Sequence, residues 1–187
     1  MSAVVYHYTD TARLPWILRD GVLRPSRNSI GDFPDPDFLW ATTMPIPDAT
    51  ASSCGPAALA ALRDGRTRSV RFTLRASDFE AWPDITAGFA AWTLSEVRRL
   101  EKAARTTTSR PWRCRVDPLP REAWLTVETR CFRDRDWTPV DTGTEIIDLG
   151  DGALGLWLGD LAYFSGQIPQ ANGNVGYSVF TGRRSAA

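Results

Sequence analysis

Short stretches in which apolar and polar residues alternate limit the fold of this chain more than any other feature. Val70, Phe72 and Leu74 alternate with arginine and threonine, which predicts a strand with one buried face. Residues 124–132 alternate in the same way over a longer stretch. Because this pattern has a period of two, it favours half-buried strands over helices.

The rest of the chain predicts a few short helices between strands. Leu14, Ile17 and Leu18 lie at helical spacing, and Gly21 is expected to end their helix. Strands separated by unequal loops predict an α+β fold in one domain over residues 1–182, followed by a frayed tail at 183–187. Further strands are expected at 4–8, 38–43, 112–116, 145–149, 154–158 and 177–181, and further helices at 56–64 and 89–104.

Charge and hydropathy restrict the partners of the chain. Its 187 residues carry 22 basic and 22 acidic side chains, whereas a basic nucleic-acid-binding domain usually has an excess of positive charge. No apolar run has the roughly 20 residues that span a bilayer, and residues 1–6 lack the pattern of a secretory signal. We therefore expect a cytoplasmic location and no membrane partner.

The metal-binding residue types are sparse. Cys54, Cys114 and Cys131 are widely spaced, form no CxxC pair, and are accompanied by a single histidine. A usual zinc site needs four such ligands, so we expect free thiols and no metal.

The only histidine, His7, lies in the segment Tyr6-His7-Tyr8-Thr9 at the end of the first predicted strand. A histidine at a strand end, just before a helix, is well placed to reach a ligand. Alternatively, His7 is a packed or surface side chain without a chemical role.

The order of segments after His7 resembles the start of the ADP-ribosyltransferase superfamily. A His-x-Thr strand is followed by a short helix, Leu14 to Gly21, then by Val22-Leu23, a polar loop, and the strand Phe38-Leu39-Trp40-Ala41-Thr42-Thr43. The resemblance covers residues 4–43 and is similar to a bacterial branch that includes DNA-modifying toxins of toxin–antitoxin systems. It implies split β-sheets with short flanking helices.

The resemblance also implies roles for individual residues. His7 would hydrogen-bond the ribose of NAD⁺, and Tyr8 and Thr9 would help to hold the nicotinamide end. The second strand would shape the nicotinamide pocket through Trp40, Thr42 and Thr43.

Glu128 is the best match to the family's later-strand glutamate. It would hold a ribose hydroxyl and, with His7, form the catalytic pair, because a carboxylate stabilises the positive charge that develops on the sugar. Thr126 stands where a second acidic or amide residue is usual in members that modify arginine. Alternatively, Glu128 is a strand carboxylate paired with Arg130 or Arg115, and Trp40 is a core aromatic residue.

The resemblance thus implies a transferase with NAD as co-substrate, a nucleic acid or protein as acceptor, and an antitoxin or immunity protein as partner. Two alternatives stay open. The chain is a binding module that has kept the fold and lost the chemistry, or it is similar to enzymes that act on an RNA 2′-phosphate. The second alternative needs a basic surface, which eight arginines could form: Arg71, Arg75, Arg98, Arg99, Arg105, Arg110, Arg113 and Arg115.

Overall fold

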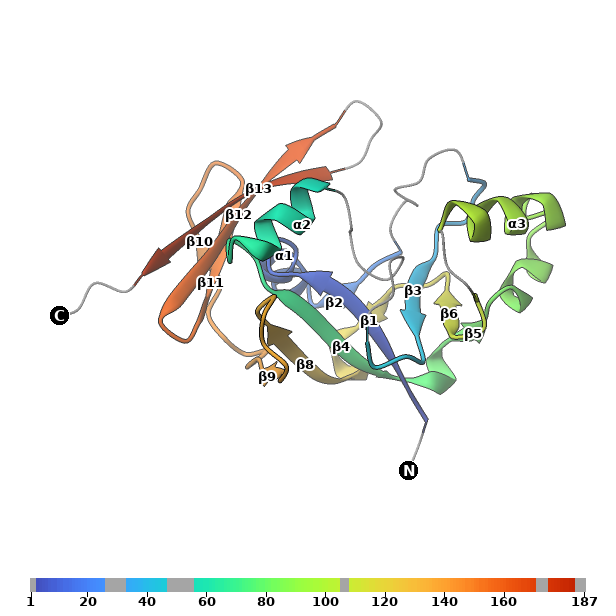
Figure 1. The fold of residues 1–187 in the computed structure, drawn as a ribbon, viewed down its shortest axis with the longest axis horizontal. Helices are drawn as coiled ribbons and strands as arrows, with labels where there is room; N and C mark the ends of the chain where they lie inside the picture. Colours follow the sequence, from blue (N-terminus) through green and yellow to red (C-terminus); the bar gives the residue numbers. More distant parts are fainter. Residues whose placement is uncertain (1–2, 26–32, 47–55, 105–107, 171–174, 184–187) are drawn as a thin grey trace. The chain divides into compact units, whose positions relative to one another are not determined.

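Antiparallel strand pairs and short helices make up the chain, which confirms the predicted α+β class. The structure, a computed structural model, describes residues 3–25, 33–46, 56–104, 108–170 and 175–183 (Figure 1). In these ranges no helix combines the length and the apolar character needed to cross a bilayer. The helices are α1 (Leu14–Asp20), α2 (Pro56–Arg63) and α3 (Leu94–Ala103). The strands are β1 (Val4–Asp10), β2 (Val22–Leu23), β3 (Leu39–Thr42), β4 (Ser69–Arg75), β5 (Glu80–Ala81), β6 (Trp112–Arg115), β7 (Leu119–Pro120), β8 (Trp124–Arg130), β9 (Thr138–Pro139), β10 (Ile147–Asp148), β11 (Ala153–Leu158), β12 (Leu161–Pro169) and β13 (Val175–Arg183).

The chain divides into two compact units that are interleaved in sequence. The first holds Met1–Tyr8, Val22–Ser52 and Phe72–Leu125, and the second holds Thr9–Gly21, Ser53–Arg71 and Thr126–Ala187. Each unit is built from three separate segments, so the chain passes between the units several times and no single linker joins them. The single-domain assignment over 1–182 stays a prediction.

In the first unit, the strand order β5-β6-β3-β1 places the beginning of the chain beside later strands. β1 runs antiparallel to β3 with Tyr6 opposite Thr42, and β3 runs antiparallel to β6 with Trp40 opposite Cys114. α3 lies beside β5 and β6 in Figure 1 and packs Val97 and Leu100 into their core. That core is mainly aromatic and includes Phe38, Trp82, Trp92, Trp112 and the buried Cys114.

The helix at α3 is shorter than the predicted 89–104. A 3-10 helix over Asp84–Gly88 precedes it, and α3 begins at Leu94, after Thr93 accepts a hydrogen bond from the Glu96 N–H. Leu94 is 64% exposed, whereas Val97 and Leu100 are buried. The cap fixes the first turn, which leaves Leu94 outside the apolar face.

In the second unit, β10-β11-β12-β13 form an antiparallel sheet of their own (Figure 1). β12 pairs with β13 over nine residues, from Leu161 opposite Arg183 to Pro169 opposite Val175. α1 packs against β11, and the Trp16 Nε1–H donates a 2.9 Å hydrogen bond to Ser165 Oγ in the buried interior. The sheet is thereby attached to the helix that follows β1.

α1 ends as predicted, at Gly21 with a left-handed φ of 65°. β1 continues to Asp10, two residues beyond its predicted end. The Asp10 carboxylate then accepts the N–H groups of Ala12 and Arg13, which shapes the turn into the helix.

Candidate functional site

The imidazole of His7 is held by the strand next to its own. Its Nδ1 lies 2.7 Å from the backbone oxygen of Trp40, across the β1–β3 pair. A nitrogen that bonds a carbonyl oxygen must carry the proton, so the neutral ring has its acceptor lone pair on Nε2. The ring also lies 6.0 Å from the ring of Phe72, centroid to centroid.

The neighbours of His7 mostly serve the packing of the first unit. Tyr8 is buried, and its hydroxyl donates to the backbone oxygen of Met44 at 3.2 Å. Thr42 is also buried, and its Oγ1 accepts the Met44 N–H at 3.1 Å, so both side chains hold the end of β3. Thr43, the next residue along, is exposed.

Trp40 packs as part of the aromatic core. Its ring lies 5.1 Å from that of Trp82 and 5.7 Å from that of Trp112, in tilted and edge-on arrangements that favour aromatic contacts. Of the predicted nicotinamide-binding residues, Tyr8, Trp40 and Thr42 lie on the neighbouring strands β1 and β3, as His7 does, while Thr9 belongs to the second unit. The side chains of His7 and Tyr8 face opposite sides of β1 because they are consecutive strand residues.

Glu128 belongs to the second unit and pairs with Arg71. The guanidinium Nε and Nη2 donate to Glu128 Oε2 at 3.0 and 2.7 Å, and the two side chains are 15% and 19% exposed. Arg130 and Arg115, the partners expected from the sequence, do not form this ion pair. Arg71 is 57 residues away in the chain and reaches Glu128 from β4.

A tryptophan extends this pair into a larger group. The guanidinium of Arg71 lies 4.4 Å from the centre of the Trp137 ring, and that of Arg130 lies 4.7 Å from it. Both distances are typical of cation–π contacts. Sequence reasoning missed Trp137, which lies just before β9, the strand that pairs with β8 at Glu128 and Thr129.

His7 and Glu128 contact consecutive residues of β4. His7 contacts Phe72, and Glu128 pairs with Arg71. Side chains of β4 alternate between buried and partly exposed positions, so Phe72 and Arg71 face opposite ways.

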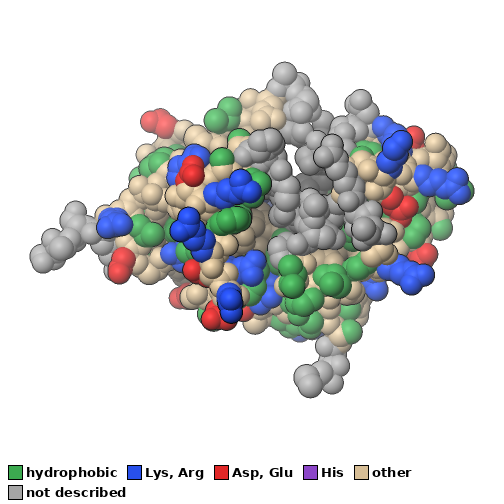
Figure 2. Space-filling view, viewed as in Figure 1, with side chains coloured by type: hydrophobic (Ala, Val, Ile, Leu, Met, Phe, Trp, Pro, Cys, Tyr) green, Lys and Arg blue, Asp and Glu red, His purple; other side chains and the backbone are tan. Residues whose placement is uncertain are grey.

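The arginines considered as a basic strip make local bonds. Arg99 pairs with Glu96, and Arg71 pairs with Glu128. Arg113 donates to the backbone oxygens of Arg110 and Trp112, and Arg115 donates to that of Asp117. On the face drawn in Figure 2, basic and acidic side chains are interspersed, and Arg105 lies outside the described residues.

The thiols and carboxylates of the described residues form no group of three or more that could hold a metal ion. Cys114 and Cys131 are free thiols, the first buried and the second half-buried, and Cys54 lies outside the described residues. Burial raises the pKa of both thiols, that of Cys114 well above its ordinary value. A raised pKa disfavours the thiolate that a nucleophilic cysteine needs.

Comparisons with protein-family models, with curated proteins and with solved structures each find no match for this chain.

Proposed function

We propose that this chain is an NAD⁺-dependent ADP-ribosyltransferase, with its binding site on the strand pair β1–β3. The observation that carries the proposal is the hydrogen bond between His7 Nδ1 and the Trp40 backbone oxygen. It joins the two segments on which the resemblance to the superfamily depends, and it fixes the orientation of the ring that would contact a ribose hydroxyl.

Glu128 would stabilise the positive charge that develops when the bond between nicotinamide and ribose breaks. Two hydrogen bonds from Arg71 end on Oε2, and the other oxygen, Oε1, would accept a ribose 2′-hydroxyl. Nicotinamide leaves with the electron pair of the broken bond, and the acceptor's nucleophilic atom forms a new bond to the ribose carbon. We propose a nucleic acid or a protein as acceptor, and the role of a cytoplasmic toxin with an antitoxin or immunity partner.

A second candidate is a binding module that has kept this fold without its chemistry. The specific observation in its favour is the Arg71–Glu128 pair, which commits the carboxylate to a neighbouring side chain. Under this hypothesis Glu128 stabilises the fold and NAD⁺ is not consumed.

Nicotinamide release from labelled NAD⁺ separates the two candidates. The protein is incubated with NAD⁺ and with single-stranded DNA, RNA or protein as acceptor. His7→Asn and Glu128→Gln are compared with Glu145→Gln, which changes an exposed glutamate that is not part of the proposed site. The transferase predicts release by the wild type and by Glu145→Gln, and a loss of roughly 100-fold or more in the other two variants.

Calorimetry at millimolar NAD⁺ completes the test. Binding that weakens in His7→Asn supports the site on β1 and β3. Release that survives both His7→Asn and Glu128→Gln would refute the assignment of these residues. Absence of both binding and release would favour the module.

A further inference from the structure

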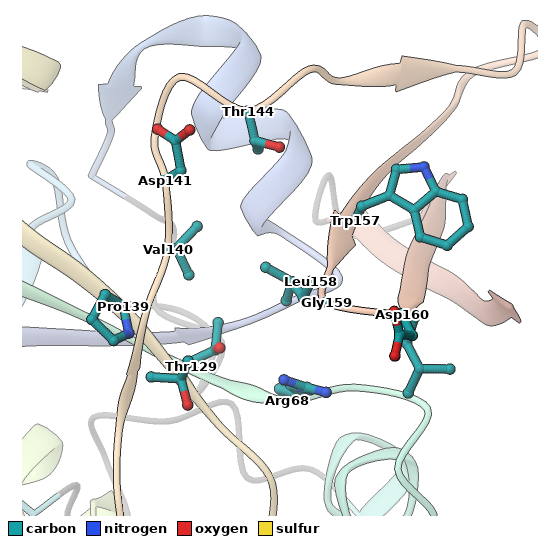
Figure 3. Close-up of a pocket in the computed structure, with 12 residues that line it drawn as sticks. Arg68, Thr129, Pro139, Val140, Asp141, Thr144, Trp157, Leu158, Gly159 and Asp160 are labelled. Atoms are coloured by element: carbon teal, nitrogen blue, oxygen red, sulfur yellow. The ribbon is translucent and has the colours of Figure 1, made fainter. Parts of the chain in front are cut away.

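A cavity of about 520 Å³ lies within the second unit, between the end of the β11–β12 hairpin and the segment that follows β9 (Figure 3). Its volume lies in the range of small-molecule sites, roughly 300–1,000 Å³. Its walls combine apolar residues such as Val140 and Leu158 with polar ones: Arg68, Thr129, Thr138, Asp141, Thr144 and Asp160. Apolar walls that carry convergent polar groups are typical of sites that orient a small organic molecule.

Thr11 and Tyr163 hold Arg68 in place. Its backbone N–H donates to Thr11 Oγ1 at 2.9 Å, and its side-chain Nε donates to Tyr163 Oη at 2.7 Å. Its guanidinium also lies 5.2 Å from the centre of the Tyr163 ring. Tyr163 is buried, so these contacts fix the direction of a side chain that is otherwise long and flexible.

The two Nη groups of Arg68 are the part of the guanidinium that Tyr163 does not use. Among the described residues, Arg68 takes part in none of the ion pairs. A guanidinium held by a neutral hydroxyl keeps its full charge for a ligand. Oxyanions such as phosphate match its planar set of donors.

The other polar groups of the cavity indicate what accompanies the anion. Thr129 contributes a hydroxyl from β8, and Asp160 contributes a carboxylate from the two-residue turn between β11 and β12. The carboxylate of Asp141 is engaged in its own loop, where Oδ1 accepts the Gly143 N–H at 2.9 Å. A carboxylate beside an anion-binding arginine disfavours a bare anion and favours a ligand that also offers hydroxyl donors.

We propose that this cavity binds a small organic phosphate that carries hydroxyl groups, such as a sugar phosphate. Arg68 binds the phosphate through its Nη groups, the Thr129 hydroxyl donates to the same phosphate, and Asp160 accepts a sugar hydroxyl. None of the residues assigned to NAD⁺ lines this cavity, so a test of this site is independent of a test of the proposed transferase.

Isothermal titration with ribose 5-phosphate tests the site in the full chain without NAD⁺. Arg68→Gln is compared with Arg66→Gln, which removes an exposed arginine paired with Asp64. Loss of charge-assisted hydrogen bonds is expected to weaken binding roughly tenfold or more in Arg68→Gln, whereas Arg66→Gln should bind as the wild type does. Far-UV circular dichroism confirms that Arg68→Gln is folded, and Asp160→Asn provides a second variant that leaves Tyr163 untouched.

Two further ligands separate the phosphate contact from the hydroxyl contact. Ribose without phosphate should not bind measurably at the same concentration, and inorganic phosphate should bind more weakly than ribose 5-phosphate. Asp160→Asn should weaken ribose 5-phosphate and leave inorganic phosphate unchanged. The proposal is overturned if ribose 5-phosphate fails to bind, if Arg68→Gln binds it with unchanged affinity, or if inorganic phosphate binds equally well.

Discussion

The ion pair between Arg71 and Glu128 allows a quantitative test of whether Glu128 has a structural role. The two side chains are 15% and 19% exposed, so the pair lies between two well-characterised limits. Exposed pairs contribute about 0.2–1 kcal/mol, whereas breaking a fully buried pair costs about 3–5 kcal/mol. Two hydrogen bonds at 2.7 and 3.0 Å on one carboxylate oxygen favour a coupling energy of about 1–2 kcal/mol.

A double-mutant cycle measures this coupling. Arg71→Gln, Glu128→Gln and the double variant are unfolded in urea, and the free energy of unfolding is followed by far-UV circular dichroism. Each single variant is expected to lose about 1–3 kcal/mol, because it leaves the other charge without its partner. The double variant should lose less than the sum of the two single losses.

A matched pair on the same unit provides the control. Arg66 Nη2 lies 3.2 Å from Asp64 Oδ2, but the two side chains are 46% and 60% exposed. The cycle of Arg66→Gln and Asp64→Asn should give a coupling near zero, within about 0.5 kcal/mol. A coupling of the same size in both cycles would show that Arg71 and Glu128 do not stabilise the fold as a pair.

Three other changes test the packing of the described residues. A Cβ at Gly155 would lie 2.2 Å from the ring of Phe164, so Gly155→Ala should lower the free energy of unfolding by about 1–3 kcal/mol in urea, and Phe164→Ala should relieve that strain. Ser165→Ala removes the acceptor of the buried Trp16 Nε1–H and should cost about 1–3 kcal/mol by the same measurement, whereas equal midpoints for wild type and variant would contradict the hydrogen bond. Because burial raises the pKa of the Cys114 thiol, the folded protein keeps a proton that the unfolded chain loses, so stability should fall as pH rises through the ordinary thiol range. Peptide mapping after iodoacetamide treatment should find Cys114 unmodified until the chain unfolds.

Local patterns were sufficient where one residue type decides the structure. Val70, Phe72 and Leu74, predicted to form one buried face, are fully buried in β4. Gly21 ends α1 because a left-handed φ is accessible to glycine without steric cost. These elements could be predicted because the deciding interactions are close in sequence or follow from burial alone.

The strand β12, Leu161–Pro169, was not predicted. Its later half contains glycine, glutamine and proline, which indicate a turn when the sequence is considered alone. Nine residues of β13 pair with it, and these tertiary hydrogen bonds override the local preference. The turn Gly159-Asp160 between β11 and β12 was the available signal, because a two-residue turn that begins with glycine is typical of a hairpin.

In the candidate site, too, interactions between residues close in sequence were easier to predict than those between distant residues. The order of segments in residues 4–43 predicted that His7 and Trp40 belong to one site, which stays a prediction, and β1 and β3 are neighbouring strands. The partner of Glu128 could not be predicted from its surroundings in sequence, because Arg71 reaches it from a strand 57 residues earlier. Because Arg71 donates two hydrogen bonds to one oxygen of Glu128, substitution of the arginine complements substitution of the glutamate as a test of the proposed reaction. A transferase should lose nicotinamide release in Glu128→Gln and retain part of it in Arg71→Gln, whereas a binding module should show only losses of stability in both.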